Sequence, residues 1–177
     1  MSFVACFSGG IGSGKTTLAN AVGERLGLKV ASFGGFVRRI AGTRGVPEER
    51  QALQALGEAL ITEMTFDGFC HAVLVAAGWV EGGSVVVDGI RHVAAFDAIK
   101  RLVEPVSVKL FFVDVPREVR QARAEGGQRS EGTDLAKADA HSTEQDVHGA
   151  LRDLADHVLD GTLDLKTLLD EVDRALR

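Results

Sequence analysis

Short apolar runs alternate with amphipathic segments along the whole chain. The runs at 3–8, 84–88 and 106–113 are typical of strands that are buried on both faces of a sheet. Shorter strands are predicted at 28–33 and 156–159. The segments between these runs place apolar residues three and four positions apart, as on one face of a helix. Strands that alternate with helices predict an α/β fold with a mostly parallel sheet covered on both faces.

The helical segments have recognisable ends. The helix that starts at Lys15 is capped by Gly27, and a helix that starts at Pro47 is expected to break at 66–68. Ser142 and Gln145 have the spacing of a capping box for a further helix. After the break at 66–68, a further helix is predicted to end near Gly78. The other predicted helices contain residues 36–41, 96–102, part of 116–133, 147–154 and 165–176.

Composition narrows the class of protein. A chain of 177 residues fits one domain, and 45% hydrophobic residues are ordinary for a globular protein. We expect no membrane span, no signal peptide and a cytoplasmic location with reduced thiols at Cys6 and Cys70. The net charge of −5 argues against a general nucleic-acid surface. Arginine supplies 14 of the 20 basic residues, so a local phosphate-binding cleft stays open.

Residues 9–16, with the sequence GGIGSGKT, match the phosphate-loop pattern G-x-x-x-x-G-K-[ST]. They lie between a predicted strand and a predicted helix, which is the context that the pattern requires. Glycines let the backbone N–H groups converge on an anion, and the helix adds the positive end of its dipole. We expect Lys15 to reach the β- and γ-phosphates and Thr16 to ligate Mg²⁺. The predicted ATP-binding residues are Gly10, Ile11, Gly12, Ser13, Gly14, Lys15, Thr16 and Thr17.

Asp88 closes an apolar strand and is the candidate for a second magnesium ligand. The carboxyl ends of parallel strands face the ligand crevice, so its position suits this role. An aspartate before Gly89 also begins turns, and that alternative stays open. Asp114 follows a strand too, but it leads into Pro116 at a helix start and is the weaker candidate.

With these motifs the sequence resembles the nucleoside monophosphate kinase-like group of P-loop kinases. Residues 32–38 (SFGGFVR) are similar to the adenylate kinase segment S-T-G-D-x-x-R, and 88–91 (DGIR) to D-G-x-P-R without its proline. Residues 111–129 resemble the strand-to-lid passage of that group. Gly35 replaces the aspartate of adenylate kinases, and the D-x-x-x-R-R pattern of a full lid is not evident.

The resemblance implies a three-layer α/β/α domain around a five-stranded parallel sheet. It implies a helical acceptor-binding insert at about 34–80 and a short lid at about 116–135. Arg120, Arg123 and Arg129 are then expected near the transferred phosphoryl group, with Arg120 on the ATP side. Residues 141–160 are closer to phage-type deoxynucleoside monophosphate kinases, animal-type phosphomevalonate kinases and kinases of hydroxymethylated pyrimidines in DNA. These relatives share a fold and differ in acceptor.

Arginines at two predicted strand ends suit a dianionic acceptor. Arg38 and Arg91 each follow a predicted strand and can point into one crevice, although surface arginines at helix starts also occur. Arg50 and Gln54 are one helical turn apart and are candidates for the same pocket, with Phe66 and Phe69 stacked on a base. An aromatic residue at such spacing is more often part of the core. The histidines show no ligand spacing.

These residues predict an ATP- and Mg²⁺-dependent kinase that transfers the γ-phosphoryl group to a small phosphorylated acceptor. A nucleoside or deoxynucleoside monophosphate is the first expectation. One alternative is a hydroxyl acceptor, such as a hydroxymethylated pyrimidine in DNA or dephospho-coenzyme A, which makes Asp88 the first candidate to accept the proton. A phosphomevalonate-type acceptor is another. A regulatory ATPase is the alternative of another class. The sequence does not determine the oligomeric state.

Overall fold

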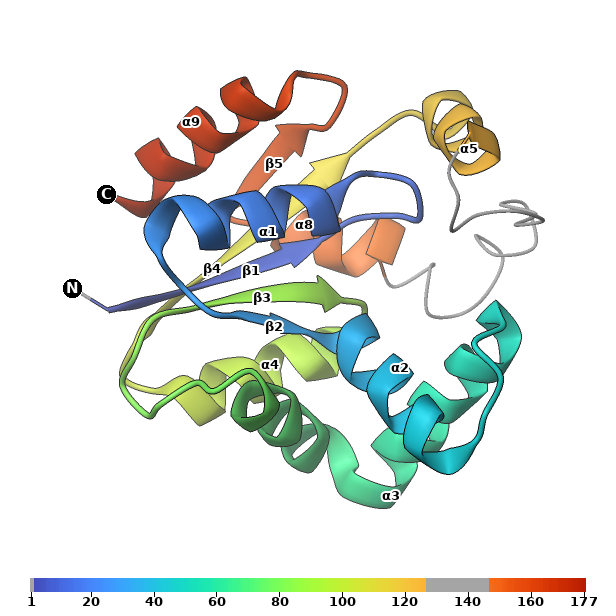
Figure 1. Cartoon of the computed structure of the whole chain (residues 1–177). Coiled ribbons are helices and arrows are strands. Elements are labelled where there is room, and N and C mark those ends of the chain that lie inside the picture. Colours follow the sequence, from blue (N-terminus) through green and yellow to red (C-terminus); the bar gives the residue numbers. More distant parts are fainter. Residues whose placement is uncertain (1, 127–146) are drawn as a thin grey trace.

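The sheet confirms the predicted fold class. The computed structural model describes residues 2–126 and 147–177 (Figure 1). Within them, five parallel strands form one sheet in the order β2-β3-β1-β4-β5. The strands are β1 (Phe3–Ser8), β2 (Val30–Ser32), β3 (Val85–Ile90), β4 (Ser107–Asp114) and β5 (His157–Asp160). Strand β1 is central, and the connections that leave it and β3 run to opposite sides of the sheet. This is the arrangement that opens a ligand crevice beyond the carboxyl ends of the strands.

Helices cover both faces of the sheet. Figure 1 shows α1 and α9 on one face and α2, α3 and α4 on the other, with α5 beyond the strand ends. The helical elements are α1 (Lys15–Leu26), α2 (Phe33–Arg44), α3 (Arg50–Ala76), α4 (Val93–Val103), α5 (Arg117–Gly126), the π-helix η1 (Val147–Leu151), α8 (Arg152–Leu154) and α9 (Leu165–Leu176). The result is the three-layer α/β/α arrangement expected of a P-loop domain.

The pleat of the strands divides the core in two. Along β1, Val4 and Cys6 belong to the cluster under α2, α3 and α4, whereas Ala5 and Phe7 belong to the cluster under α1 and α9. Phe7 stacks on Phe111 of β4 with ring centroids 5.2 Å apart. Each fully buried side chain of this size contributes about 1.5–3 kcal/mol, so both layers hold the central strand in place.

Most predicted elements lie where the patterns indicate. The C-cap of α1 is Gly27 in the left-handed region (φ 65°), as expected. Strand β2 begins two residues after the predicted start at 28, and it ends at Ser32 because α2 begins directly at Phe33 and takes in residues expected to be strand or loop. Helix α3 begins at Arg50, three residues after the predicted start at Pro47. The capping box Ser142–Gln145 lies outside the described residues.

Helix α3 contains the predicted break. Thr65 has φ 61° and ψ 169°, so the segment is two helices joined at a kink one residue before the expected position. By length and composition this segment would suffice to cross a membrane, because its mean hydropathy reaches 1.3 over 18 residues. The kink interrupts it, however, and Leu56, Leu60, Phe69 and Leu74 pack into the core. We therefore assign α3 to the core of this fold.

The conformation of Thr65 gives a stability prediction. A threonine at φ 61° and ψ 169° occupies a region that is almost restricted to glycine, at a cost of about 1–3 kcal/mol. Its hydroxyl accepts from Gly68 N at 3.4 Å, which is a weak cap that offsets little of this cost. We expect Thr65→Gly to raise the free energy of unfolding by about 1 kcal/mol in urea titrations. A decrease of that size would contradict the strain at Thr65, and Thr65→Ala, which keeps the strain and loses the cap, is the control.

Candidate active site

The phosphate loop lies at the end of the central strand, between β1 and α1. Gly12 and Gly14 have φ values of 77° and 86°, which side chains other than glycine rarely adopt. A Cβ atom at Gly12 would lie 2.8 Å from the carbonyl oxygen of Arg120, so α5 packs against the loop backbone itself. The described first turn of α1 carries no acidic residue, which leaves the N-terminal end of that helix to an anion.

Lys15 lies buried beneath the loop. Its side chain donates from Nζ to the carbonyl oxygen of Gly10 at 3.3 Å. Burial, reinforced by the positive charge of Arg91, lowers the pKa of Lys15 to about 7, although Asp88 acts in the opposite direction. An anion beside such a lysine stabilises its charged form and so offsets the cost of burying the ammonium group. Ser13 Oγ is also buried, and it has no hydrogen-bond partner among the described residues. Both features fit a bound phosphate chain.

Asp88 lies near the end of β3, two residues before Ile90, so the strand runs past the predicted end at Asp88. Only 3% of Asp88 is exposed. The Thr16 hydroxyl donates to it, 3.1 Å from both carboxylate oxygens. A second hydroxyl, that of Ser32 on β2, donates to Asp88 Oδ2 at 3.1 Å. Because β3 is the neighbour of both β1 and β2, one carboxylate receives a hydroxyl from each side. The predicted proximity of Thr16 and Asp88 is therefore present in the structure.

The donor set suits a magnesium ion held jointly with phosphates. Among the described residues, no group of three His, Cys, Asp or Glu side chains could hold a metal by itself. Mg²⁺ is commonly bound through one or two protein oxygens, with phosphate oxygens and water completing its coordination. The Thr16 hydroxyl and the Asp88 carboxylate are oxygen donors of this kind. The residues present thus fit Mg²⁺ bound together with a nucleotide.

Two further arginines lie close enough to Lys15 to act on its charge. Arg91, at the end of β3, and Arg50, at the start of α3, both act on the charge of Lys15. Burial and the positive charge of Arg50 lower the pKa of Arg91 to about 10, so it remains charged at neutral pH. Helix α3 thus brings Arg50 beside a strand end that is 41 positions away in the sequence. Like charges held this close favour an anionic ligand.

The other predicted acceptor residues are less closely tied to this cluster. Arg38 is exposed on α2 and folds back toward Gly34, where its guanidinium nitrogens lie 3.6–3.7 Å from the position of a Cβ atom. Phe66 is half-buried and packs on His92, with ring centroids 5.5 Å apart. It therefore lies beside the residue that follows Arg91, and it also packs against the core. Gln54 is half-buried on α3.

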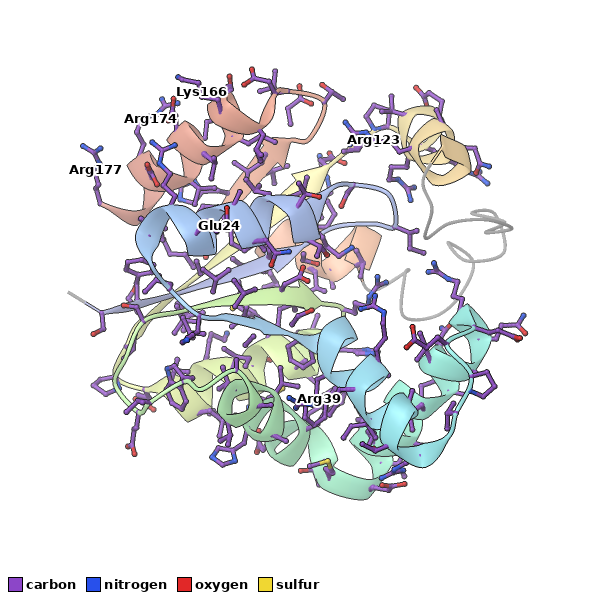
Figure 2. All side chains as sticks on the ribbon, in the orientation of Figure 1. Glu24, Arg39, Arg123, Lys166, Arg174 and Arg177 are labelled. Atoms are coloured by element: carbon purple, nitrogen blue, oxygen red, sulfur yellow. The ribbon has the colours of Figure 1, made fainter. Side chains whose placement is uncertain are left out.

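The arginines of α5 contact the phosphate loop from outside. Arg120 is 4% exposed and donates from Nη1 to the carbonyl oxygen of Ile11 at 3.3 Å. Arg123 donates from Nη1 to the carbonyl oxygen of Ser13 at 3.2 Å and from Nη2 to that of Gly161 at 2.9 Å. Figure 2 shows Arg123 on the side of α5 that faces the loop. These contacts support the loop, and Arg129 lies outside the described residues.

The weaker magnesium candidate, Asp114, is engaged elsewhere. At the end of β4 it accepts from Arg152 of α8, with Arg152 Nη2 at 3.0 Å from Asp114 Oδ2. This pair is exposed.

Two contacts of the site were not predicted from the sequence. Ser32 was placed within a motif and not singled out, and the contact of Arg123 with Gly161 was not foreseen. The strand-end position of Ser32 is the signal that could have indicated its proximity to Asp88.

Three comparisons place the chain among known proteins. It matches the model of a protein family described as an AAA domain over residues 6–159. The UPF0200 protein of Aeropyrum pernix is 32% identical to it over 171 residues, which are 94% of this chain and 88% of that protein. The shikimate kinase of Aquifex aeolicus has a TM-score of 0.63 at 16% identity, covering 98% of this chain and 96% of that one. The shikimate kinase of Acinetobacter baumannii, solved in complex with shikimate, has a TM-score of 0.67 at 13% identity, covering 99% and 93%.

The two solved structures confirm the P-loop kinase fold, and at such low identity they show the fold alone. The narrower resemblance to nucleoside monophosphate kinases stays a prediction.

The lowered pKa of Lys15 gives a prediction about proton uptake. With a pKa of about 7, Lys15 is mostly neutral at about pH 8, and a bound triphosphate raises its pKa by favouring the ammonium. MgATP binding at about pH 8 should therefore take up as much as about one proton. At about pH 6 the lysine is already charged and uptake should vanish, so nucleotide affinity should fall as pH rises through 7. Calorimetry in buffers of different ionisation enthalpy measures this uptake.

Lys15→Met is the matched control for that experiment. It should bind nucleotide more weakly and without the uptake seen at about pH 8. An equal uptake in this variant would assign the proton to another group.

Proposed function

Because the chain belongs to the AAA-domain family of P-loop proteins, we propose that it is an ATP- and Mg²⁺-dependent phosphotransferase. Its acceptor in this proposal is a small phosphorylated molecule, with a nucleoside or deoxynucleoside monophosphate as the first candidate. The two buried, unpaired cysteines, Cys6 and Cys70, are in keeping with a reducing cytoplasm.

The observation that carries the proposal is the distribution of charge around Lys15. Among the described residues, the charges that act on it are those of Arg91, Arg50 and Arg120, together with one carboxylate, Asp88. The triphosphate that the loop is suited to bind accounts for Lys15. Arg91, which follows β3, and Arg50, which begins α3, are further cations near it and suit a second anion. A site with two anion-binding halves is what transfer between two phosphorylated molecules requires.

The hydrogen bonds of Asp88 favour a phosphate over a hydroxyl as the attacking group. A hydroxyl acceptor must lose a proton to a nearby base, whereas a phosphate oxygen is already anionic. Asp88 is the carboxylate beside the loop, and it accepts hydrogen bonds from Thr16 and Ser32. A carboxylate held in this way suits the support of a metal ion better than the removal of a proton.

The roles of the residues follow from these positions. In this proposal Lys15 and the loop amides hold the β- and γ-phosphates, and Arg91, Arg50 and Arg38 hold the acceptor phosphate in line with them. Thr16 and Asp88 would hold Mg²⁺, which neutralises charge on the phosphates. Phosphoryl transfer needs mainly positioning and charge neutralisation, so no covalent step on the protein is required.

The division of the chain into parts belongs to the same proposal. Residues 34–80 form the acceptor-binding insert, with Gln54 and Phe66 in the pocket for the acceptor base. The proposed lid is 116–135, of which the structure describes 116–126, and in it Arg120 supports the nucleotide side. The proposed role of Arg123, and of Arg129 outside the described residues, is to neutralise charge on the transferred group once both substrates are bound.

A screen for acceptors tests the proposed function. ADP release would be followed for the full chain with MgATP and mononucleotides, dephospho-coenzyme A, phosphomevalonate, shikimate or hydroxymethylated DNA. We expect release to rise only with acceptors that are phosphorylated on a phosphate oxygen, namely mononucleotides or phosphomevalonate, and the product should carry the transferred phosphoryl group in mass spectrometry. Rapid release without acceptor would indicate an ATPase, and release with dephospho-coenzyme A, shikimate or DNA alone would indicate a hydroxyl acceptor. Either result would overturn the proposal.

Three arginine variants test the two-sided site. We expect Arg91→Ala and Arg38→Ala to raise the KM for the acceptor about tenfold to a hundredfold, since each removes a charged hydrogen bond to phosphate. The KM for ATP should change little. Arg39→Ala is the matched control, because Arg39 is the neighbour of Arg38 on α2 and stacks over Phe36 at 5.2 Å, away from the phosphate loop (Figure 2). A larger effect on ATP than on acceptor would contradict the assignment.

A further inference from the structure

Ser32 makes two hydrogen bonds that join the two halves of the proposed site. It is the last residue of β2 and lies in register with Asp88 on β3. Its hydroxyl donates to Asp88 Oδ2 at 3.1 Å and accepts from the backbone N–H of Gly35 at 3.1 Å. The second bond makes Ser32 the N-cap of α2, the helix that carries Arg38. One hydroxyl thus touches both the carboxylate beside the phosphate loop and the helix on the acceptor side.

Gly35 packs closely against the side chain of Ser32. A Cβ atom on Gly35 would lie 3.3 Å from both Cβ and Oγ of Ser32. This is tighter than ordinary van der Waals contact, so glycine at 35 allows the hydroxyl to approach the backbone N–H. Ser32 itself has extended backbone angles (φ −99°, ψ 117°), as an N-cap residue requires. The side chain of Ser32 therefore lies where the end of β2, the start of α2 and Gly35 meet.

We propose that Ser32 is a positioning residue that links the orientation of Asp88 to the first turn of α2. This inference rests on the proposed function, because it gives Asp88 a metal-supporting role and α2 an acceptor-binding role. With Asp88 fixed by its ligands, the Ser32 hydroxyl is fixed in turn, and the N–H of Gly35 is held at the start of α2. Binding on the nucleotide side thereby orders the helix that carries Arg38.

Both properties of the hydroxyl are needed for this link. The donor hydrogen reaches Asp88, and the oxygen lone pair accepts from Gly35. Ser32→Ala removes both. Ser32→Gly removes both bonds too, yet glycine at an N-cap costs the helix little stability, so the effect of this variant reports mainly the lost bond to Asp88. Ser32→Thr retains both properties and is the conservative variant.

Kinetics of the full chain provide the first test. Residues that orient a metal-supporting ligand typically change metal affinity or activity by about tenfold to a hundredfold. We expect Ser32→Ala and Ser32→Gly to lower kcat, or to raise the Mg²⁺ concentration at half-saturation, by about that factor. Ser32→Thr should stay within about threefold of the parent protein. Equal activity of the parent and Ser32→Gly would overturn the inference, because this variant has lost the bond to Asp88 while the start of α2 is little destabilised.

Hydrogen exchange provides a test that does not depend on turnover. In the parent protein, Mg²⁺ with a non-hydrolysable ATP analogue should slow amide exchange of residues 33–38 about tenfold. In Ser32→Ala and Ser32→Gly this slowing should be absent, although the phosphate loop remains protected. Asp164→Ala is the matched control, because Asp164 caps α9 by accepting from Thr167 N at 3.0 Å. It should lose protection at the start of α9 and keep the response at 33–38.

The outcomes separate this inference from the proposed function. Slowing at 33–38 that persists in Ser32→Gly would overturn the inference and leave the kinase proposal intact. A parent protein that shows no protection of the loop by the nucleotide would contradict both.

Discussion

Two charged side chains buried at the carboxyl end of the sheet determine how the rest of the site is built. Lys15 is 8% exposed and Asp88 is 3% exposed, and burying a charge is costly unless it is paired or hydrogen-bonded. Asp88 is compensated from two sides by the hydroxyls of Thr16 and Ser32. Lys15 is compensated only in part, by the Gly10 carbonyl and by Asp88. A bound polyphosphate would supply the negative charge that Lys15 still lacks.

The order of the strands makes this arrangement possible in a small domain. Because β1 lies between β3 and β4, the phosphate loop opens beside Asp88 on one side and beside the segment that leads to α5 on the other. On that second side, Arg120 and Arg123 hold the carbonyl oxygens of Ile11 and Ser13. The fold thus holds the phosphate loop in place with few residues, while α3 brings Arg50 close enough to act on the charge of Lys15.

Sequence reasoning succeeded where the signal is local. The phosphate loop, Asp88 at its strand end and the break near Thr65 depend on patterns within a few residues, and all three are present in the structure. The length of β2 was overestimated, because an apolar run does not show where a helix begins. The bond between Ser32 and Asp88 depends on strand order and register, and the contact of Arg123 with Gly161 joins distant segments. Neither is encoded in a local pattern, so neither was predicted.

The central claim is that the loop side binds the donor and that Arg91 and Arg50 bind the acceptor. A crystal structure with Mg²⁺, a non-hydrolysable ATP analogue and a mononucleotide measures this most directly. The account predicts the β- and γ-phosphates at Lys15 and the loop amides, Mg²⁺ at Thr16 and Asp88, and the mononucleotide phosphate at Arg91 and Arg50. A triphosphate bound to Arg91 and Arg50, or a mononucleotide bound elsewhere with these arginines turned to the protein surface, would contradict it.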